Sequence, residues 1–336
     1  MIERQQKKQC RTMNYIGIDI AKKTFVAAFP KEKGFKVKSF PNNVDGIRDF
    51  IKGLDPEQDR CVMEATGNYC FLLLYLLEKK GISACMVNPK QTKHFARMMM
   101  EVTKTDAKDA CMIAMYGQKM EPPVYKIPTE SIMRLKQKRT VIRQLRKQYT
   151  ALNNLKESLS VMPNMDKSCE KSITKTMEFI GKQLDKLENE MADLTNVEYQ
   201  KQMELLTSIR GIGPACAAAL IIATSGFTCF DNAKQVSRYF GLCPTYQQSG
   251  TSIHVRGGIS HMGDSQIRGA LFMASMAAIR TNTSCKEFFY KLRKNGKPGK
   301  VALTAVSNKL IRQAFAVVKS GVPYIDGYVS PNPMTA

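Results

Sequence analysis

Histidine is scarce in this sequence, and cysteine never occurs in close pairs. The 336 residues contain three histidines, at positions 94, 254 and 261. Few residues could therefore serve as zinc ligands or as a histidine general base. The ten cysteines include no Cys-x-x-Cys pair, and most lie within apolar runs. We expect them to be reduced, buried side chains rather than metal ligands or disulfides.

Long hydrophobic runs are also lacking. The apolar stretches at residues 71–77 and 215–223 are far shorter than the ~20 residues that a membrane-spanning helix needs. The basic residues near the N-terminus are not followed by the apolar segment that a secretory signal carries. The sequence thus predicts no membrane partner and a cytoplasmic protein.

Acidic residues are few compared with basic ones. Aspartate and glutamate total 29 against 51 lysines and arginines, which gives a formal net charge of +22. A compact protein with this excess repels itself unless a polyanion compensates, and nucleic-acid phosphates are the usual compensators. The length exceeds that of one ordinary domain, so we expect at least two hydrophobic cores.

The first part of the chain has the pattern of an α/β domain. Strand-like segments are expected near 14–19, 24–29, 60–64 and 83–87, and helices near 44–53, 68–80, 89–99 and 106–118. Prolines at positions 122, 123 and 128 then break the pattern. We place an α/β domain at 13–125, a helical arm at 126–200 and a mainly helical domain at 201–325.

Four carboxylates in the α/β domain are the candidate metal ligands. Asp19 and Glu64 close apolar strand patterns, and Asp106 and Asp109 open a helical pattern. Acids three residues apart share one face of a helix, and open α/β sheets keep their sites at the carboxyl ends of strands. Carboxylates grouped in this way suit Mg²⁺, and two such ions can assist phosphoryl transfer. The alternative is structural: Asp106 caps the helix, and Asp109 favours its N-terminus.

A strongly basic helix is expected from Glu130 to about Lys156. No acid occurs between Ser131 and Asn154, so we predict an uncompensated face that contacts nucleic acid. A second helix, from about 166 to 194, is expected to pair with the first as an antiparallel coiled-coil arm, for which oligomerisation is the structural alternative. The basic candidates for nucleic-acid contact on the first helix are Arg134, Lys138, Arg139, Arg143, Arg146 and Lys147.

The last part of the chain begins with a pattern like a helix-hairpin-helix motif. Gly211 and Gly213 precede a helix of small residues, and glycines there allow backbone N–H groups to approach a phosphate. Residues 240–260 are expected to be rich in loops and include Ser249 and Arg256, the latter a candidate phosphate contact. From the local pattern alone, Ser249 is a turn residue.

Taken together, the motifs resemble those of the DEDD transposases of the insertion sequence 110 family, which are bridge-RNA-guided recombinases. The resemblance covers nearly the whole chain. It rests on residues 17–19, 64–67, 104–110, 209–213, 240–244, 249–250 and 269–272, which stand in the family's order.

The resemblance implies an RNase H-like (RuvC-like) first domain in which Asp19, Glu64, Asp106 and Asp109 bind metal, two Mg²⁺ ions with Mn²⁺ as the alternative. It also implies that Ser249 is the nucleophile of the C-terminal transposase domain and forms a covalent link to DNA. The implied partners are donor and target DNA, a non-coding bridge RNA and further copies of the chain as a dimer or tetramer. Such a protein acts at the nucleoid of a prokaryotic cell.

Two other functions remain open from the residues themselves. The first is a RuvC-like, metal-dependent junction endonuclease, in which water is the nucleophile and Ser249 is structural. The second is a non-catalytic nucleic-acid-binding protein. A covalent protein–DNA adduct separates the recombinase from the nuclease, and metal-dependent cleavage excludes the binding protein.

Overall fold

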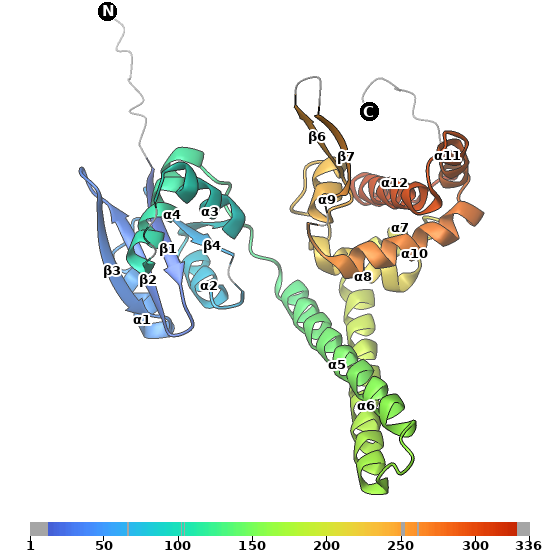
Figure 1. The fold of residues 1–336 in the computed structure, drawn as a ribbon. Coiled ribbons are helices and arrows are strands. Elements are labelled where there is room, and N and C mark those ends of the chain that lie inside the picture. Colours follow the sequence, from blue (N-terminus) through green and yellow to red (C-terminus); the bar gives the residue numbers. More distant parts are fainter. Residues whose placement is uncertain are drawn as a thin grey trace, which may run out of the picture. The chain divides into compact units, whose positions relative to one another are not determined.

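The computed structural model describes residues 13–65, 67–101, 103, 105–249, 253–260 and 262–327. The chain divides into two compact units, of which one ends at Ile127 and the other begins at Pro128. We call them the sheet unit and the helical unit (Figure 1).

The sheet unit is built on a mixed five-stranded sheet. Its order is β3-β2-β1-β4-β5, in which β1 pairs antiparallel with β2 and parallel with β4 (Figure 1). The expected hairpin of the first two strands is confirmed. The strands are β1 (Asn14–Ile20), β2 (Thr24–Pro30), β3 (Phe35–Pro41), β4 (Asp59–Glu64) and β5 (Ser83–Val87).

Helices cover both faces of this sheet, because successive side chains of a strand point to opposite faces. Ile16 and Ile18 belong to a core that includes Ile47 of α1, whereas Tyr15 belongs to a core with Ile113 of α4. The helices of this unit are α1 (Val44–Ile51), α2 (Phe71–Lys79), α3 (Pro89–Met98) and α4 (Asp106–Met120).

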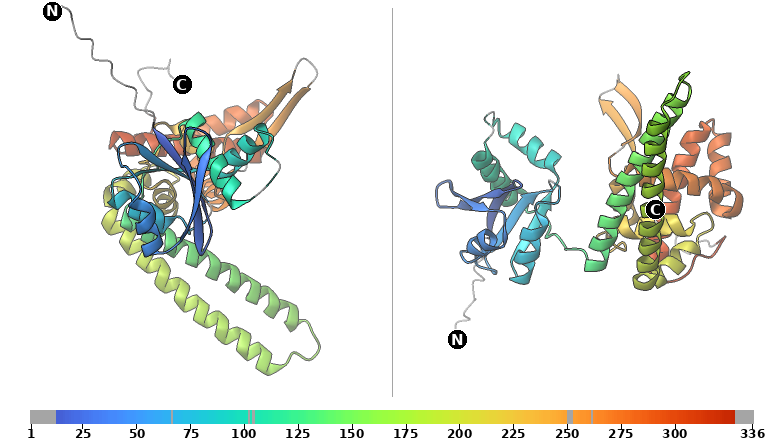
Figure 2. Two further views of the ribbon diagram at one scale, coloured as in Figure 1. Left: turned by 90° about the vertical axis from the view of Figure 1, so that its left-hand side faces the viewer. Right: turned by 90° about the horizontal axis from the view of Figure 1, so that it is seen from below.

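Two long helices, α5 (Glu130–Ser160) and α6 (Lys167–Glu198), form the expected antiparallel arm (Figure 2). Thr129 caps α5 and Asp166 caps α6. The Nζ of Lys156 donates to the Oγ1 of Thr174 at 2.9 Å, which joins the two helices near the turn. On α5 only Ile132, Leu135 and Ile142 are buried, because the far half of a two-helix arm has nothing else to pack against.

The rest of the helical unit is a bundle around one core. A hairpin of β6 (Pro244–Ser249) and β7 (Ile253–Ile259) stands where we expected loops, so that expectation was wrong. The helices are α7 (Gln200–Thr207), α8 (Pro214–Thr224), α9 (Ala233–Tyr239), α10 (Ser265–Thr281), α11 (Thr283–Lys294) and α12 (Gly299–Ser320).

Helix α12 is long and apolar enough to cross a membrane by length and composition alone, which the sequence analysis overlooked. Its buried residues, among them Val306, Leu310 and Ile311, belong to the core of the helical unit. Burial in that core accounts for its apolar composition.

The cysteines are less buried than expected. All nine in the described residues are free thiols, and Cys61, Cys70, Cys85 and Cys285 are buried. Burial raises the pKa of the Cys85 and Cys285 thiols to about 11, so both are poor nucleophiles at neutral pH. Three others are half-buried, and Cys169 and Cys229 are exposed.

Candidate functional site

Asp19 and Glu64 lie at the carboxyl ends of neighbouring parallel strands, Asp19 as the penultimate residue of β1 and Glu64 as the last residue of β4. Ile18 of β1 is paired with Met63 of β4, and both side chains belong to the core on the side of α1 and α2. The next residue on each strand points the opposite way. Asp19 and Glu64 therefore both face the side that α4 covers, and both are partly exposed.

Helix α4 lies directly against β1 at Gly17. A Cβ atom on Gly17 would be 2.1 Å from the carbonyl oxygen of Ala110 and 2.2 Å from the nitrogen of Ala114. Two residues earlier on β1, Tyr15 lies against Gly117, where an added Cβ would be 2.9 Å from the Cβ of Tyr15. The helix thus runs opposite to β1, so its N-terminal turn lies toward the end of the strand that carries Asp19.

Asp106 and Asp109 lie in that N-terminal turn. Thr105 is the cap, because its side chain accepts a hydrogen bond from the backbone N–H of Lys108, so the alternative role of Asp106 as the cap is wrong. The Nζ of Lys108 binds Glu101 at 2.8 Å and holds the pKa of Glu101 below its usual range. Lys108 therefore neutralises Glu101, which is not one of the four candidate ligands.

The topology brings the four acids to one region, but it does not assemble them into a finished metal site. Within the described ranges, which include all four, no three acidic, histidine or cysteine side chains form a group that could hold a metal ion. Asp19 and Asp109 have further interactions of their own in the structure. The donor set, four carboxylates on two strands and one helix, suits a hard cation such as Mg²⁺.

Thr92 is a residue of this region that the sequence analysis missed. It lies on α3, is buried, and its hydroxyl donates a hydrogen bond to the Oε1 of Glu64. Glu64 and Thr92 are 28 residues apart, and a threonine in a helix carries no signal of such a contact. A hydrogen bond of this kind fixes the orientation of a ligating carboxylate.

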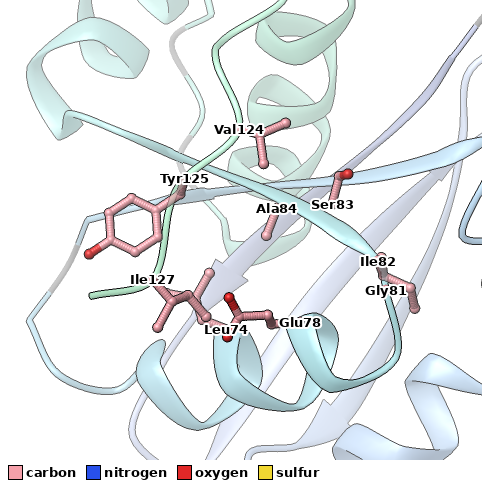
Figure 3. Close-up of a pocket in the computed structure, with 9 residues that line it drawn as sticks. All are labelled: Leu74, Glu78, Gly81, Ile82, Ser83, Ala84, Val124, Tyr125 and Ile127. Atoms are coloured by element: carbon pink, nitrogen blue, oxygen red, sulfur yellow. The ribbon is translucent and has the colours of Figure 1, made fainter. Parts of the chain in front are cut away.

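A hollow of about 210 Å³ in the sheet unit lies elsewhere. Figure 3 shows it between α2, β5 and residues 124–127, with Leu74 beside Ile127. It adjoins Ser83 at the start of β5, whereas Glu64 pairs with Val87 at the other end of that strand. This mainly apolar hollow is therefore separate from the carboxylates.

Ser249 is the last residue of β6. The register of the hairpin pairs Ser249 with Ile253 and Tyr246 with Arg256. Arg256 is thus three ladder positions from the Ser249–Ile253 pair, roughly 10 Å along the strand. Residues 250–252, which include the glycine after the serine, lie outside the described residues.

We had expected the basic face of the arm to be uncompensated, and the structure shows that this is wrong: acidic side chains pair with three of its basic residues. Lys138 pairs with Glu190, Arg146 with Glu188 at 2.8 Å, and Arg139 with Asp264 at 2.7 Å. The acids come from α6 and from the start of α10, so a count along α5 alone misses them. In the part of the chain that the structure describes, Arg134, Arg143 and Lys147 are exposed and form no ion pair.

The helix-hairpin-helix pattern corresponds to α7, a turn and α8, but its two glycines differ. Gly211 has φ +106°, and a Cβ there would lie 2.6 Å from the Cβ of Ala278 on α10. Packing within the unit therefore requires this glycine. Gly213 is the N-cap of α8 with no side-chain hydrogen bond at the cap, and a Cβ there would meet open space.

Two family models match the chain, one in each part. The model of DEDD transposases of the IS110 type, described as a transposase, matches residues 16–162, and that of the transposase IS116/IS110/IS902 family matches residues 203–290. The two matches include all four carboxylates and Ser249.

Two of the similar proteins match over almost their whole length, and a third over a smaller part. The pilin gene-inverting proteins of Moraxella bovis and Moraxella lacunata are each 29% identical to the chain over 92% of its length and 97% of theirs. A protein of insertion element IS110 from Streptomyces coelicolor is 32% identical over 36% of this chain and 29% of its own.

Proposed function

Because the chain belongs to the IS110 family of transposases and is therefore an enzyme of DNA recombination, we propose that it cuts and rejoins DNA with four carboxylates and one serine. The carboxylates are Asp19, Glu64, Asp106 and Asp109 of the sheet unit, and the serine is Ser249 of the helical unit.

One observation carries the carboxylate assignment: the parallel pairing of β1 and β4 against α4. It turns Asp19 and Glu64 to the same face, toward which the first turn of α4 carries Asp106 and Asp109. The strand order β3-β2-β1-β4-β5, with the first three strands antiparallel and the last two parallel to β1, supports an RNase H-like (RuvC-like) fold.

The four acids are the residues that would hold divalent metal, two Mg²⁺ ions with Mn²⁺ as the alternative. When bound, such ions stabilise the charge of the attacking and leaving oxygens of a phosphodiester. The protein's own contribution is orientation: Thr92 holds Glu64, and the contact of Gly17 with α4 fixes the first turn relative to β1.

The serine step conserves the energy of the phosphodiester bond, because the phosphate stays esterified throughout. The Oγ of Ser249 attacks phosphorus and loses its proton, the bond from phosphorus to the leaving strand breaks, and the leaving oxygen is protonated. A hydroxyl of the new strand then attacks the seryl phosphodiester, and Ser249 regains its proton. No external energy source is needed, because each step exchanges one phosphate ester for another.

The partners follow from the same proposal. Donor and target DNA are the substrates, a non-coding bridge RNA supplies recognition, and the carboxylates of one copy act with the serine of another in a dimer or tetramer. Exposed Arg134, Arg143 and Lys147 and the open N-terminus at Gly213 support contacts to phosphates. The reaction takes place in the cytoplasm, at the nucleoid.

Inversion of a DNA segment is a second candidate outcome of the same chemistry. Two relatives that match over 97% of their length carry pilin gene-inverting protein as their name. Cutting and rejoining at two inverted sites produces inversion, whereas the same steps on separate molecules produce insertion. Reactions on one plasmid that carries two inverted sites, and on two plasmids that carry one site each, sequenced afterwards, distinguish the two.

The carboxylate assignment is tested with Asp19→Asn. We expect Mg²⁺-dependent strand cleavage to be lost and nucleic-acid binding to remain, because the change removes ligand charge while the side-chain volume stays nearly the same. The matched control is Asp49→Asn on α1, an exposed acid paired with Lys52. Cleavage by Asp19→Asn at the rate of the control would show that Asp19 is not one of the metal-binding carboxylates.

A further inference from the structure

A second hollow lies in the helical unit, at the base of the arm. We call it the arm-base pocket. Lys136, Arg139 and Arg143 of α5 line one side, and Tyr239 at the end of α9 and Asp264 before α10 line the other. Its volume is about 250 Å³, below the ~300–1,000 Å³ of sites for drug-sized ligands. A hollow of this size encloses part of one nucleotide, and a duplex does not fit.

The pocket carries three cations and one acid. Arg139 pairs with Asp264 at 2.7 Å, and the two side chains are 21% and 27% exposed. Among the residues that the structure describes, neither Lys136 nor Arg143 forms an ion pair. After the internal pair is subtracted, two positive charges remain around one hollow, which favours an anion there.

The charge of Lys136 is partly desolvated in this hollow, which is unfavourable for the ammonium group. Burial lowers the pKa of its ammonium group, because water is partly removed from the charge. Its Nζ donates to the hydroxyl of Ser225 at 3.1 Å, and an ammonium group carries three donors. An anion in the pocket would offset the lost hydration and accept a charge-assisted hydrogen bond.

Tyr239 gives the pocket an aromatic wall. Its ring packs edge-on against Phe230 and Phe240, at 5.3 and 5.2 Å between ring centroids, and half of the residue is exposed. These contacts hold the ring while part of it remains accessible. A flat, fixed ring beside cations is a surface on which an unpaired base stacks.

The wall opposite α5 is locked in place by the backbone. A Cβ on Gly263 would lie 2.0 Å from the carbonyl oxygen of Tyr239, and one on Gly241 would lie 2.0 Å from that of Met262. Arg268 donates to the carbonyl oxygens of Phe240, Met262 and Gly263 at 3.1 to 3.3 Å. Tyr239 and Asp264 therefore stand in fixed positions.

We propose that the arm-base pocket binds one nucleotide of single-stranded nucleic acid, with its phosphate between Lys136, Arg139 and Arg143 and its base on Tyr239. The proposal rests on the proposed function in that the chain handles nucleic acid. Cations and an aromatic ring on one hollow distinguish it from the exposed face of α5, which offers phosphate contacts alone.

The test is a binding titration with the full chain in chelator, so that no cleavage takes place. The probes are a fluorescent oligothymidylate, an oligouridylate and an abasic oligodeoxynucleotide of the same length. Wild type is expected to bind the base-containing strands more tightly than the abasic one. Tyr239→Leu should lose roughly five-fold or more in affinity and most of that discrimination, whereas Tyr239→Phe should keep both.

Lys136→Gln should weaken all three strands roughly ten-fold, and Lys147→Gln, an exposed lysine on the same helix, should weaken them less. The base-containing strand that wild type binds more tightly, oligothymidylate or oligouridylate, identifies DNA or RNA as the source of the nucleotide. Equal affinity of wild type for base-containing and abasic strands, or pocket variants no weaker than Lys147→Gln, would overturn the proposal. Thermal unfolding of each variant identifies any that lost its fold; if Tyr239→Leu did, Lys136→Gln and the comparison of base-containing with abasic strands in wild type then decide.

The outcome is independent of the reaction. If the protein binds as expected but forms no covalent link to DNA, the proposed function is wrong and the nucleotide-binding role of the pocket stands. If the protein cuts and rejoins DNA through Ser249 but binds normally when the pocket is altered, only the role of the pocket is wrong.

Discussion

In the sheet unit, Asp19 and Glu64 lie near the carboxyl ends of two hydrogen-bonded strands that helices cover on both faces, whereas in the helical unit Ser249 ends one strand of a two-stranded hairpin. The carboxylates gain their positions from strand register and from a helix packed on Gly17. The basic groups of the helical unit gain theirs from pairs across helices, such as Arg139 with Asp264.

This difference separates two kinds of placement. The groups that we propose share a metal lie where local register and close backbone packing fix them. Groups that attract a polyanion lie on a long helical surface, where acids from other helices neutralise some and leave others available. Changes in the sheet unit should therefore affect chemistry or folding strongly, and changes on the arm should affect binding gradually.

The largest effect is expected from Gly17→Ala. The added Cβ would overlap the backbone of α4, which must shift, and we expect a loss of about 1–3 kcal/mol or more of the sheet unit's free energy of unfolding. Gly53→Ala is the control, since its Cβ meets only the carbonyl oxygen of Phe50 at an ordinary 3.7 Å. Hydrogen exchange resolved by unit measures both. Equal protection of α4 in the two variants would contradict the packing argument.

An intermediate effect is expected from Thr92→Ala. It removes the hydroxyl that binds Glu64, so cleavage should fall roughly 10–100-fold while nucleic-acid binding stays the same. Thr92→Ser keeps the hydroxyl and should restore most of the rate. Single-turnover cleavage with titrated Mg²⁺ is the measurement. If Ser and Ala were equally slow, the methyl packing of Thr92 and not its hydrogen bond would be what matters.

The smallest effect is expected on the arm, and it should differ between two arginines. Arg143 forms no ion pair among the described residues, and Arg146 binds Glu188. Arg143→Gln should reduce the slope of log affinity against log salt by roughly 0.7–0.9, the value of one phosphate contact. Arg146→Gln should reduce it by less. Equal slopes for both variants would show that the pairing with Glu188 does not decide which arginine meets phosphate.

Most strands of the sheet unit could be predicted from the sequence, because these strands have clear apolar patterns. Strand β5 was predicted with its observed bounds, and β1, β2 and β4 to within one residue. Strand β3 was missed: it is an edge strand with exposed Lys36 and Lys38, so no apolar run marks it. The hairpin of β6 and β7 was missed because β6 is mostly polar and the paired glycines of β7, Gly257 and Gly258, are typical of loops.

For the candidate site, local sequence predicted the strand ends and the helix start that carry the four acids. It did not predict the partners that tertiary structure brings from far along the chain. Arg139 meets Asp264 across 125 positions, and Glu64 meets Thr92 across 28. Neither contact has a period or a motif, so each required the fold.

The most direct test of the central claim is the covalent link itself. Reactions of the full chain with end-labelled DNA and Mg²⁺, stopped in denaturant and resolved on a denaturing gel, should show a protein-sized shift of the label for wild type. Ser249→Ala should show no shift and no rejoined product, while still binding nucleic acid, because loss of one hydroxyl costs little stability at a hairpin end. Rejoined strands from Ser249→Ala, with no shift in wild type, would contradict the account and favour water or a 3′-hydroxyl as the nucleophile.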